Sequence, residues 1–131
     1  ENADDEEVLE AEVDVEDDLR SEIVTYALQF VGNRYKYGGT NPNTGVDCSG
    51  FTSYVMRHAA EVELPHSSGG QSRMGRQVSS SEMRPGDIIC YPGHVAIYMG
   101  GGRIVHASTP SSGICYGNAT YRTITMVRRV L

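Results

Sequence analysis

The sequence predicts an α+β fold in which amphipathic helices come first and antiparallel strands follow. Apolar side chains recur at helical spacing in two segments of the first half, at about residues 19–31 and 48–60. After residue 86 the pattern changes to short runs rich in β-branched and aromatic residues, divided by Gly and Pro. Because the two kinds of element are segregated along the chain, we expect the helices to pack on one face of an antiparallel sheet.

The first helix is predicted where an apolar stripe follows an acidic run, and Gly32-Asn33 ends it. Its stripe consists of Leu19, Ile23, Tyr26, Ala27, Phe30 and Val31. The second helix is predicted from about Cys48 to Ala60, and Leu64-Pro65 lies beyond its end. Its core face consists of Phe51, Tyr54, Val55, Met56 and Ala59. Residues 38–46 and 67–75 are rich in turn formers and are expected to be loops.

Strands are predicted in the second half of the chain, where Gly and Pro separate the β-branched and aromatic runs. The expected strands are residues 87–91, 94–99, 103–107 and 123–130. No internal repeat accompanies them. The sequence therefore describes a single small domain with helices on an antiparallel sheet.

Charge is distributed very unevenly along the 131 residues. Residues 1–22 carry 12 of the 17 acidic side chains and one of the 11 basic ones, whereas the remainder has a net charge of +5. Residues 1–18 contain too few large apolar residues, and too much like charge, to fold alone. We therefore predict an acidic, disordered linker over residues 1–18 and one folded domain over residues 19–131.

A linker at the start, without an initiating Met or a charged-then-apolar leader, indicates a segment of a longer precursor. Its targeting signal is then expected upstream, and secretion is expected on the same ground. No apolar run approaches the roughly 18 residues that a membrane-spanning helix requires. We therefore expect no membrane insertion by this segment.

Several kinds of site are not expected. The cysteines at 48, 90 and 115 form no C-x-x-C pair, and the four histidines lack zinc-ligand spacing, so neither a metal nor a cofactor is predicted. Cys90 and Cys115 are expected to be core thiols. No basic stripe with interleaved aromatic residues is present, so nucleic acid is not an expected partner.

Cys48 is the candidate nucleophile. In the first turn of the second helix, its sulfur faces unpaired backbone N–H groups and the positive end of the helix dipole, which favour the thiolate. Asp47 is placed to cap this helix, and Gly50 permits the close approach of a substrate or a neighbouring backbone. The alternative interpretation is that Cys48 is a small buried hydrophobic residue.

His94 and His106 are the candidate base and its orienting partner. Three glycines at residues 100–102 suit a three-residue hairpin loop, which pairs Met99 with Arg103. This register places the two histidines on the same sheet face as diagonal neighbours, about 7–8 Å apart, whereas a two-residue loop would separate them. His94 is then the general base and later the acid, and His106 fixes its tautomer. With Cys48, the pair outlines a thiol hydrolase.

Five motifs occur in a fixed order along the chain. They are Y-x-Y-G-G-T at 35–40, D-C-S-G-F at 47–51, M-R-P-G-D at 83–87, G-H-V-A-I-Y at 93–98 and I-V-H-A at 104–107. Together they resemble the NlpC/P60 family of cell-wall cysteine peptidases over about residues 20–131. The resemblance implies a compact papain-like fold and makes residues 19–131 a catalytic domain. It further implies hydrolysis of peptidoglycan stem peptides, commonly at the γ-D-glutamyl bond to the following diamino acid.

The resemblance also assigns roles to single residues. Cys48 matches the nucleophile, His94 the base and His106 the third polar residue. Tyr35 matches a tyrosine beside the catalytic cysteine that helps to stabilise the oxyanion. The groove that receives the amino end of the peptide is lined at positions that match Asp47 and Ser49. On the strength of this resemblance we expect a monomer, tethered to upstream domains and located at the bacterial exterior or in the periplasm.

Two other functions remain open at the level of sequence. One is a different thiol acyl-transfer reaction, such as that of an N-acetylmuramoyl-L-alanine amidase. The other is a non-catalytic cell-wall binding module on the same fold. Cys48 precedes His94, whereas in the related acyl transferases the histidine comes first, so the order argues against an acyl transferase. A binding module would be free to lose its nucleophile or base, so the presence of both argues against that function.

Overall fold

Helices occupy the first half of the chain and most strands the second, as the sequence predicts. The computed structural model describes residues 3–131, with side chains from Glu16 onward. The helices are α1 (Ala3–Leu28), α2 (Cys48–Ala60) and α3 (Ser68–Gln71), and Ser80–Glu82 forms a 3-10 turn. The strands are β1 (Thr40–Asn41), β2 (Gly45–Val46), β3 (Arg76–Val78), β4 (Ile88–Tyr91), β5 (His94–Gly100), β6 (Arg103–Thr109), β7 (Gly113–Asn118) and β8 (Met126–Arg129).

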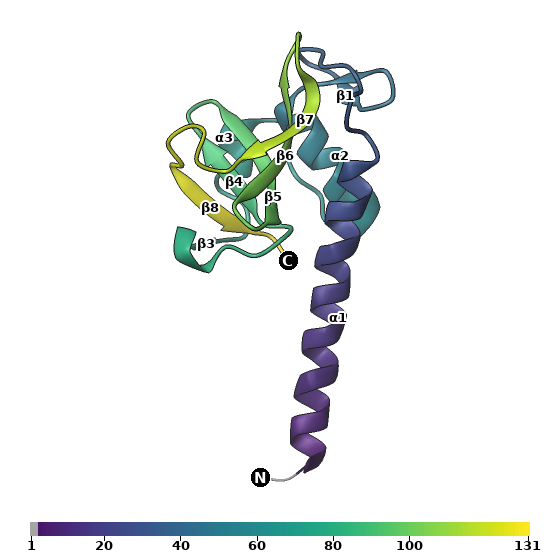
Figure 1. The fold of residues 1–131 in the computed structure, drawn as a ribbon, viewed down its shortest axis with the longest axis vertical. Helices are drawn as coiled ribbons and strands as arrows, with labels where there is room; N and C mark the ends of the chain where they lie inside the picture. The colour runs from purple at the N-terminus through teal and green to yellow at the C-terminus, as the bar shows by residue number, and fades with distance from the viewer. Residues whose placement is uncertain (1–2) are drawn as a thin grey trace.

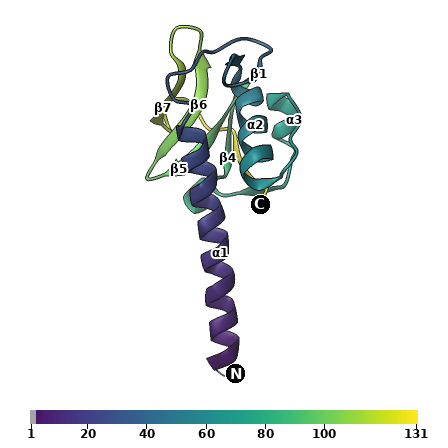
Figure 2. The ribbon, with the colours of Figure 1, turned by 90° about the vertical axis from the view of Figure 1, so that its right-hand side faces the viewer.

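One antiparallel sheet of six strands carries the core. Its spatial order is β3-β8-β4-β5-β6-β7, and β1 and β2 form a separate two-stranded ribbon. Figures 1 and 2 show α1 and α2 side by side against the sheet. Ile23 and Phe51 of the helices share one apolar core with Val95 and Val105 of the strands. The predicted packing of helices on an antiparallel sheet is therefore confirmed.

The opposite face of the sheet is also buried. Because side chains alternate along a strand, Ala96 and Ile104 point away from the helices and belong to a second apolar cluster. His94 lies two residues before Ala96, and His106 lies two residues after Ile104. Both histidines therefore point to this second face.

The β5–β6 hairpin has the register on which the histidine prediction depends. Ile97 pairs with Val105, as the three-residue glycine loop predicts. The loop itself is different, because Gly100 and not Met99 pairs with Arg103. The turn therefore has two residues, Gly101 and Gly102, and a bulge just before Gly100 adds one more residue to β5. This extra residue gives the same register as a three-residue loop. The predicted register is confirmed, and the predicted Met99–Arg103 pair is wrong.

Four strands lie where the sequence predicts none: β1 and β2, within the predicted loop of residues 38–46, and β3 and β7. The short helix α3 likewise lies within the predicted loop of residues 67–75. β7 pairs with β6, and the short strand β3 pairs with β8 at the sheet edge. β7 contains two glycines, Gly113 and Gly117, which interrupt its apolar pattern. Because glycine has a low strand propensity, the sequence does not indicate this strand. In addition, β8 begins at Met126 and not at residue 123, and α1 ends at Leu28 and not at residue 31.

Helix α1 begins at Ala3, inside the segment for which the sequence predicts disorder. Once the buried part of α1 has formed, each further residue adds a helical hydrogen bond without a new nucleation step, and Ala, Glu and Leu favour the helix. Figure 1 shows α1 extending away from the domain. The division into a linker (residues 1–18) and a catalytic domain stays a prediction. Within the described residues, α1 included, no helix has both the length and the apolar content needed to cross a membrane.

Buried ionic contacts fasten α1 to the sheet. Asp87 is fully buried and its two carboxylate oxygens accept hydrogen bonds of 3.0 and 2.8 Å from Arg129. Arg20 of α1 approaches the same carboxylate at 3.3 Å and donates to the carbonyl oxygen of Pro85 at 2.8 Å. Asp87 therefore joins α1, β8 and the turn before β4, which accounts for the burial of two guanidinium groups.

We expect Asp87→Ala to lower the free energy of unfolding by about 3–5 kcal/mol, because it leaves Arg20 and Arg129 buried without their carboxylate. Urea unfolding followed by circular dichroism measures the change. Glu63→Gln is the matched control, since Glu63 forms an exposed pair with Arg57 at 3.3 Å and its loss is expected to cost less than about 1 kcal/mol. Similar losses in both variants would contradict a stabilising role for the buried contacts.

Candidate active site

Cys48 is the first residue of α2, as predicted, and Asp47 caps the helix. Asp47 has an extended backbone, and its Oδ1 accepts a hydrogen bond of 2.8 Å from the N–H of Gly50. Its Oδ2 accepts another, of 2.9 Å, from the N–H of Gly38. One carboxylate therefore holds both the start of the helix and the glycine loop that precedes it.

Two glycines bring this loop and the helix into backbone contact. A Cβ atom on Gly50 would collide with the carbonyl oxygen of Gly39, and one on Gly39 would collide with that of Gly45. The N–H of Asp47 also donates to the carbonyl oxygen of Gly39, at 3.3 Å. The close approach predicted at Gly50 is thus made by neighbouring backbone. The two motifs that contain these glycines form one packed unit.

The surroundings of Cys48 correct the prediction of a ready thiolate. Burial raises the pKa of the Cys48 thiol above its ordinary value, and the Asp47 carboxylate raises it further. The backbone N–H groups of Val95, Ser49 and Cys48 act in the opposite direction on this pKa. The helix start supplies the predicted donors, but they do not offset the loss of water. At neutral pH the resting group is therefore the thiol.

The two histidines meet as predicted. Nε2 of His94 and Nδ1 of His106 are 2.8 Å apart, and the ring planes are inclined at 71°. Their side chains are buried, with residue exposures of 7% and 4%. Burial lowers the pKa of each histidine to about 4, and Arg122 contributes to both shifts. The pair is therefore neutral near pH 7 and able to accept a proton.

Cys48 lies beside the backbone of β5. The N–H of Val95, the residue after His94, faces Sγ. Among the side-chain hydrogen bonds of residues 16–131, none joins Sγ to an imidazole nitrogen of His94. Because His106 occupies Nε2, Nδ1 is the nitrogen of His94 that remains for the thiol. Such contacts are often long before substrate binds.

A groove of about 350 Å³ opens beside Cys48. Its lining residues are Tyr35, Tyr37, Asp47, Cys48, Ser49, His66, Ser67, Ser68 and Gly93. The groove thus brings together four of the six predicted site residues, and Gly93 places the start of β5 at its edge. The other two, His94 and His106, lie on the second face of the sheet.

The groove contains a contact between His66 and Asp47 and the partly buried phenol of Tyr35. His66 Nε2 lies 2.7 Å from Oδ1 of Asp47. Burial raises the pKa of Tyr35, with further contributions from Cys48 and Asp47, so the Tyr35 hydroxyl keeps its proton. Within the described part of the chain, no three His, Cys, Asp or Glu residues cluster as metal ligands.

Comparison with known proteins places this chain in a family. The sequence model of the NlpC/P60 family matches residues 32–128. The chain belongs to the NlpC/P60 family. Over 102 residues it is 40% identical to the murein DD-endopeptidase MepS/murein LD-carboxypeptidase of Escherichia coli K12, covering 74% of this chain and 53% of that protein. It is also 38% identical over 117 residues to the gamma-DL-glutamyl hydrolase of Bacillus subtilis 168, covering 82% of this chain and 27% of that protein.

Solved NlpC/P60 structures have the same fold. The NlpC/p60 domain of the peptidoglycan hydrolase SagA superimposes with a TM-score of 0.77 and 31% identity, covering 84% of this chain and 97% of that one. The peptidoglycan hydrolase RipB of Mycobacterium tuberculosis gives a TM-score of 0.78 at 27% identity, covering 87% and 65%. The predicted papain-like fold is confirmed. The chain spans about half the length of its Escherichia coli relative and about a quarter of that from Bacillus subtilis.

One residue that the sequence pattern does not indicate supports the candidate nucleophile in this NlpC/P60 domain. Gln71 of α3 is buried, and its amide donates to the carbonyl oxygens of Ser49 and Pro65, each at 2.9 Å. It also meets the hydroxyl groups of Thr52 and Ser53. Gln71 therefore ties the first turn of α2 to the loop that lines the groove. Its place in a predicted Ser/Gly-rich loop gives no sign of this role.

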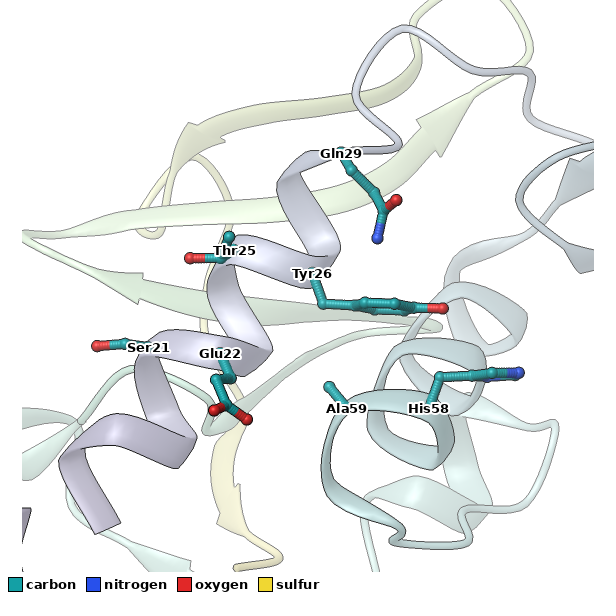
Figure 3. A pocket seen from close by; sticks show the side chains of 7 residues that line it. All are labelled: Ser21, Glu22, Thr25, Tyr26, Gln29, His58 and Ala59. Atoms are coloured by element: carbon teal, nitrogen blue, oxygen red, sulfur yellow. The ribbon is translucent and has the colours of Figure 1, made fainter. Parts of the chain in front are cut away.

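A second hollow, of about 590 Å³, lies between α1 and α2. Figure 3 shows that Tyr26 and His58 project into it from the two helices, and their rings are nearly parallel at 6.1 Å. None of the six predicted site residues lines this hollow. Although this hollow is larger than the groove beside Cys48, it is not the candidate active site, because the candidate nucleophile and base lie elsewhere.

We expect alkylation of Cys48 by iodoacetamide to be slow near pH 7 and still rising above about pH 9, since burial raises its pKa and only the thiolate reacts. Peptide mapping by mass spectrometry separates it from the other two thiols. Cys90 is the internal control, because burial raises its pKa to about 11 and should leave it unmodified in the folded protein. A plateau for Cys48 below about pH 7 would instead show a preformed thiolate.

Proposed function

We propose that this NlpC/P60 domain is a cysteine endopeptidase that cuts peptidoglycan stem peptides. The observation that carries the proposal is the buried His94–His106 contact of 2.8 Å, next to the Val95 N–H that faces the Cys48 thiol. A nucleophile, a neutral base and an orienting partner are the parts that acyl transfer requires. Two of the relatives are named as a murein endopeptidase and a peptidoglycan hydrolase, and these names support peptidoglycan as the substrate class.

In the proposed reaction, His94 Nδ1 accepts the thiol proton while Sγ forms a bond to the scissile carbonyl carbon. The Nε2–H of His94 donates to Nδ1 of His106, which fixes the productive tautomer and stabilises the imidazolium that forms. The proton then passes to the departing amine as the C–N bond breaks. Water, activated by the same imidazole, hydrolyses the thioester and restores the thiol.

The start of α2 is the proposed oxyanion site. The N–H groups of Cys48 and Ser49 belong to the first turn, where helical N–H groups have no partner within the helix. Tyr35 lines the same groove, and its protonated hydroxyl adds a further donor. One such donor is typically worth about 10²–10³ in rate.

The groove favours a substrate with an amino end. Asp47 is a carboxylate at the wall of the groove, and Ser49 supplies a hydroxyl group beside it. A peptide ammonium group that enters there gains a charge-assisted hydrogen bond. On this basis, and from the resemblance, we propose the γ-D-glutamyl bond to the diamino acid as the bond that is cut.

A second bond is supported by a specific observation. The relative with 40% identity is named for DD-endopeptidase and LD-carboxypeptidase activities, and the one with 38% identity for a γ-DL-glutamyl activity. Cleavage between cross-linked stems is therefore the second candidate. An amidase or a wall-binding module has no comparable support among these relatives. In each endopeptidase case, we propose that the domain acts at the bacterial exterior or in the periplasm, as a monomer tethered to upstream domains.

We expect digestion of purified muropeptides by this domain to release fragments cut after D-glutamate, and Cys48→Ala to release none. Mass spectrometry of the products identifies the bond. Products cut between stems would select the second candidate, and free stem peptides with intact muramic acid would select an amidase. Unchanged muropeptides with the wild-type domain would exclude peptidoglycan hydrolysis.

We expect His94→Ala to abolish measurable hydrolysis and His106→Gln to retain part of it, because an amide oxygen can still accept the Nε2–H of His94. Rates of product formation on one muropeptide measure both effects, and thermal unfolding confirms that the variants fold. His106→Ala is the matched control, since it removes the acceptor altogether. Equal and total loss in His106→Gln and His106→Ala would contradict the orienting role.

A further inference from the structure

Four aromatic rings form a closed circuit around the histidine pair. Tyr91 of β4 packs against His94 with ring centroids 5.9 Å apart, and His94 lies 5.0 Å from His106. His106 in turn lies 5.4 Å from Tyr121, which closes the circuit at 5.3 Å from Tyr91. The last two contacts are edge-on, at 68°. Tyr121 comes from the connection between β7 and β8, which contains none of the site residues predicted from the sequence.

Arg122 fastens this connection to the turn that leads into His94. Its Nη2 donates to the carbonyl oxygen of Pro92 at 2.7 Å, and Pro92 lies in the two-residue link between β4 and β5. The guanidinium group also lies 5.9 Å from the ring centroid of Tyr91 and 6.0 Å from that of Tyr121. Arg122 is therefore held by a hydrogen bond and by two rings of the circuit.

The same connection is held at its other end. The hydroxyl of Tyr91 donates to the carbonyl oxygen of Ala119 at 2.6 Å. The N–H of Ala119 donates to the carbonyl oxygen of Gly102 at 2.8 Å. Tyr121 itself is 47% exposed, whereas the histidines that it covers are almost fully buried. The ring of Tyr121 is thus a cover between the pair and water.

We propose that Tyr121 and Arg122 are positioning residues for the His94–His106 pair: Tyr121 shields the pair from water, and Arg122 keeps it free of an extra proton. This inference rests on the proposed function only in taking the pair to be the base. A proton added to the pair occupies the nitrogen that must receive the thiol proton, so a protonated pair cannot act as the base.

The charge around the pair supports this role. Burial and the Arg122 cation both lower the pKa of His106. Burial, His106 and Arg122 all lower the pKa of His94. The other titratable groups near the pair are the phenols of Tyr91 and Tyr121 and two thiols. Cys115 pairs with His106 across β6 and β7, and the Cys48 thiol faces the N–H of Val95, next to His94. Among the described side chains, no carboxylate contributes to the pKa shift of either histidine. The expected consequence is a base that stays active in mild acid.

The test is an NMR titration of the imidazole protons of His94 and His106 in the full chain. We expect Arg122→Gln to raise both pKa values by about half a unit or more, because it removes the repelling charge. Tyr121→Ala should raise them as well by admitting water, whereas Tyr121→Phe keeps the ring and should titrate like the wild type. Arg103→Gln is the matched control, since Arg103 lies over Tyr116 of the same sheet and does not act on the histidines.

A second readout uses hydrolysis. The acid limb of kcat/KM should move to higher pH in Arg122→Gln by the same amount, with KM little changed, and Arg122→Lys should restore it. If Arg122→Gln unfolds, raising the salt concentration of the wild type replaces it, since screening of this exposed cation should raise both histidine pKa values. Unchanged titrations in Arg122→Gln and Tyr121→Ala would overturn the inference. Shifted titrations in a domain that cuts no muropeptide would uphold the role of these residues while refuting the proposed function.

Discussion

The register of β5 against β6 is the constraint on which both the core and the candidate site depend. Because side chains alternate along a strand, a slip of one residue in β5 would turn Val95 and Ile97 away from the helices and carry His94 to the wrong face. The bulge before Gly100 prevents this slip by supplying the residue that the short glycine turn lacks. The pairing that buries the core therefore also brings Nε2 of His94 to within 2.8 Å of His106.

The candidate nucleophile, Cys48, is positioned from the other face of the sheet. Asp47 binds the loop and the helix start with one carboxylate, and Gly39 and Gly50 allow the two backbones to touch. These contacts carry Cys48 to the start of β5, where the N–H of Val95 faces its sulfur. The two halves of the site therefore meet across the backbone of one strand, which the sheet holds rigidly on both sides.

What the sequence predicts correctly in this domain depends on local signals. The start of α2, its Asp47 cap and the histidine register are each specified within a few residues, by a capping side chain or by a run of glycines. Gln71 and Tyr121 act across long separations in sequence and lie in segments with no regular pattern, so only the folded chain identifies them. The pKa of Cys48 is missed for a related reason: helix-start donors can be predicted, whereas burial is a property of the whole domain.

Burial keeps the candidate site uncharged, because it disfavours the thiolate form of Cys48 and the protonated form of both imidazoles. In the proposed reaction, proton transfer from Cys48 to His94 creates two charges where none existed. The groups around them are dipoles that already point the right way: helix N–H groups toward the sulfur and a neutral His106 toward the developing imidazolium. Fixed dipoles need no reorganisation when charge appears, and their effect grows as substrate displaces water from the groove. A site of this kind separates charge mainly when a substrate carbonyl is present to receive the sulfur.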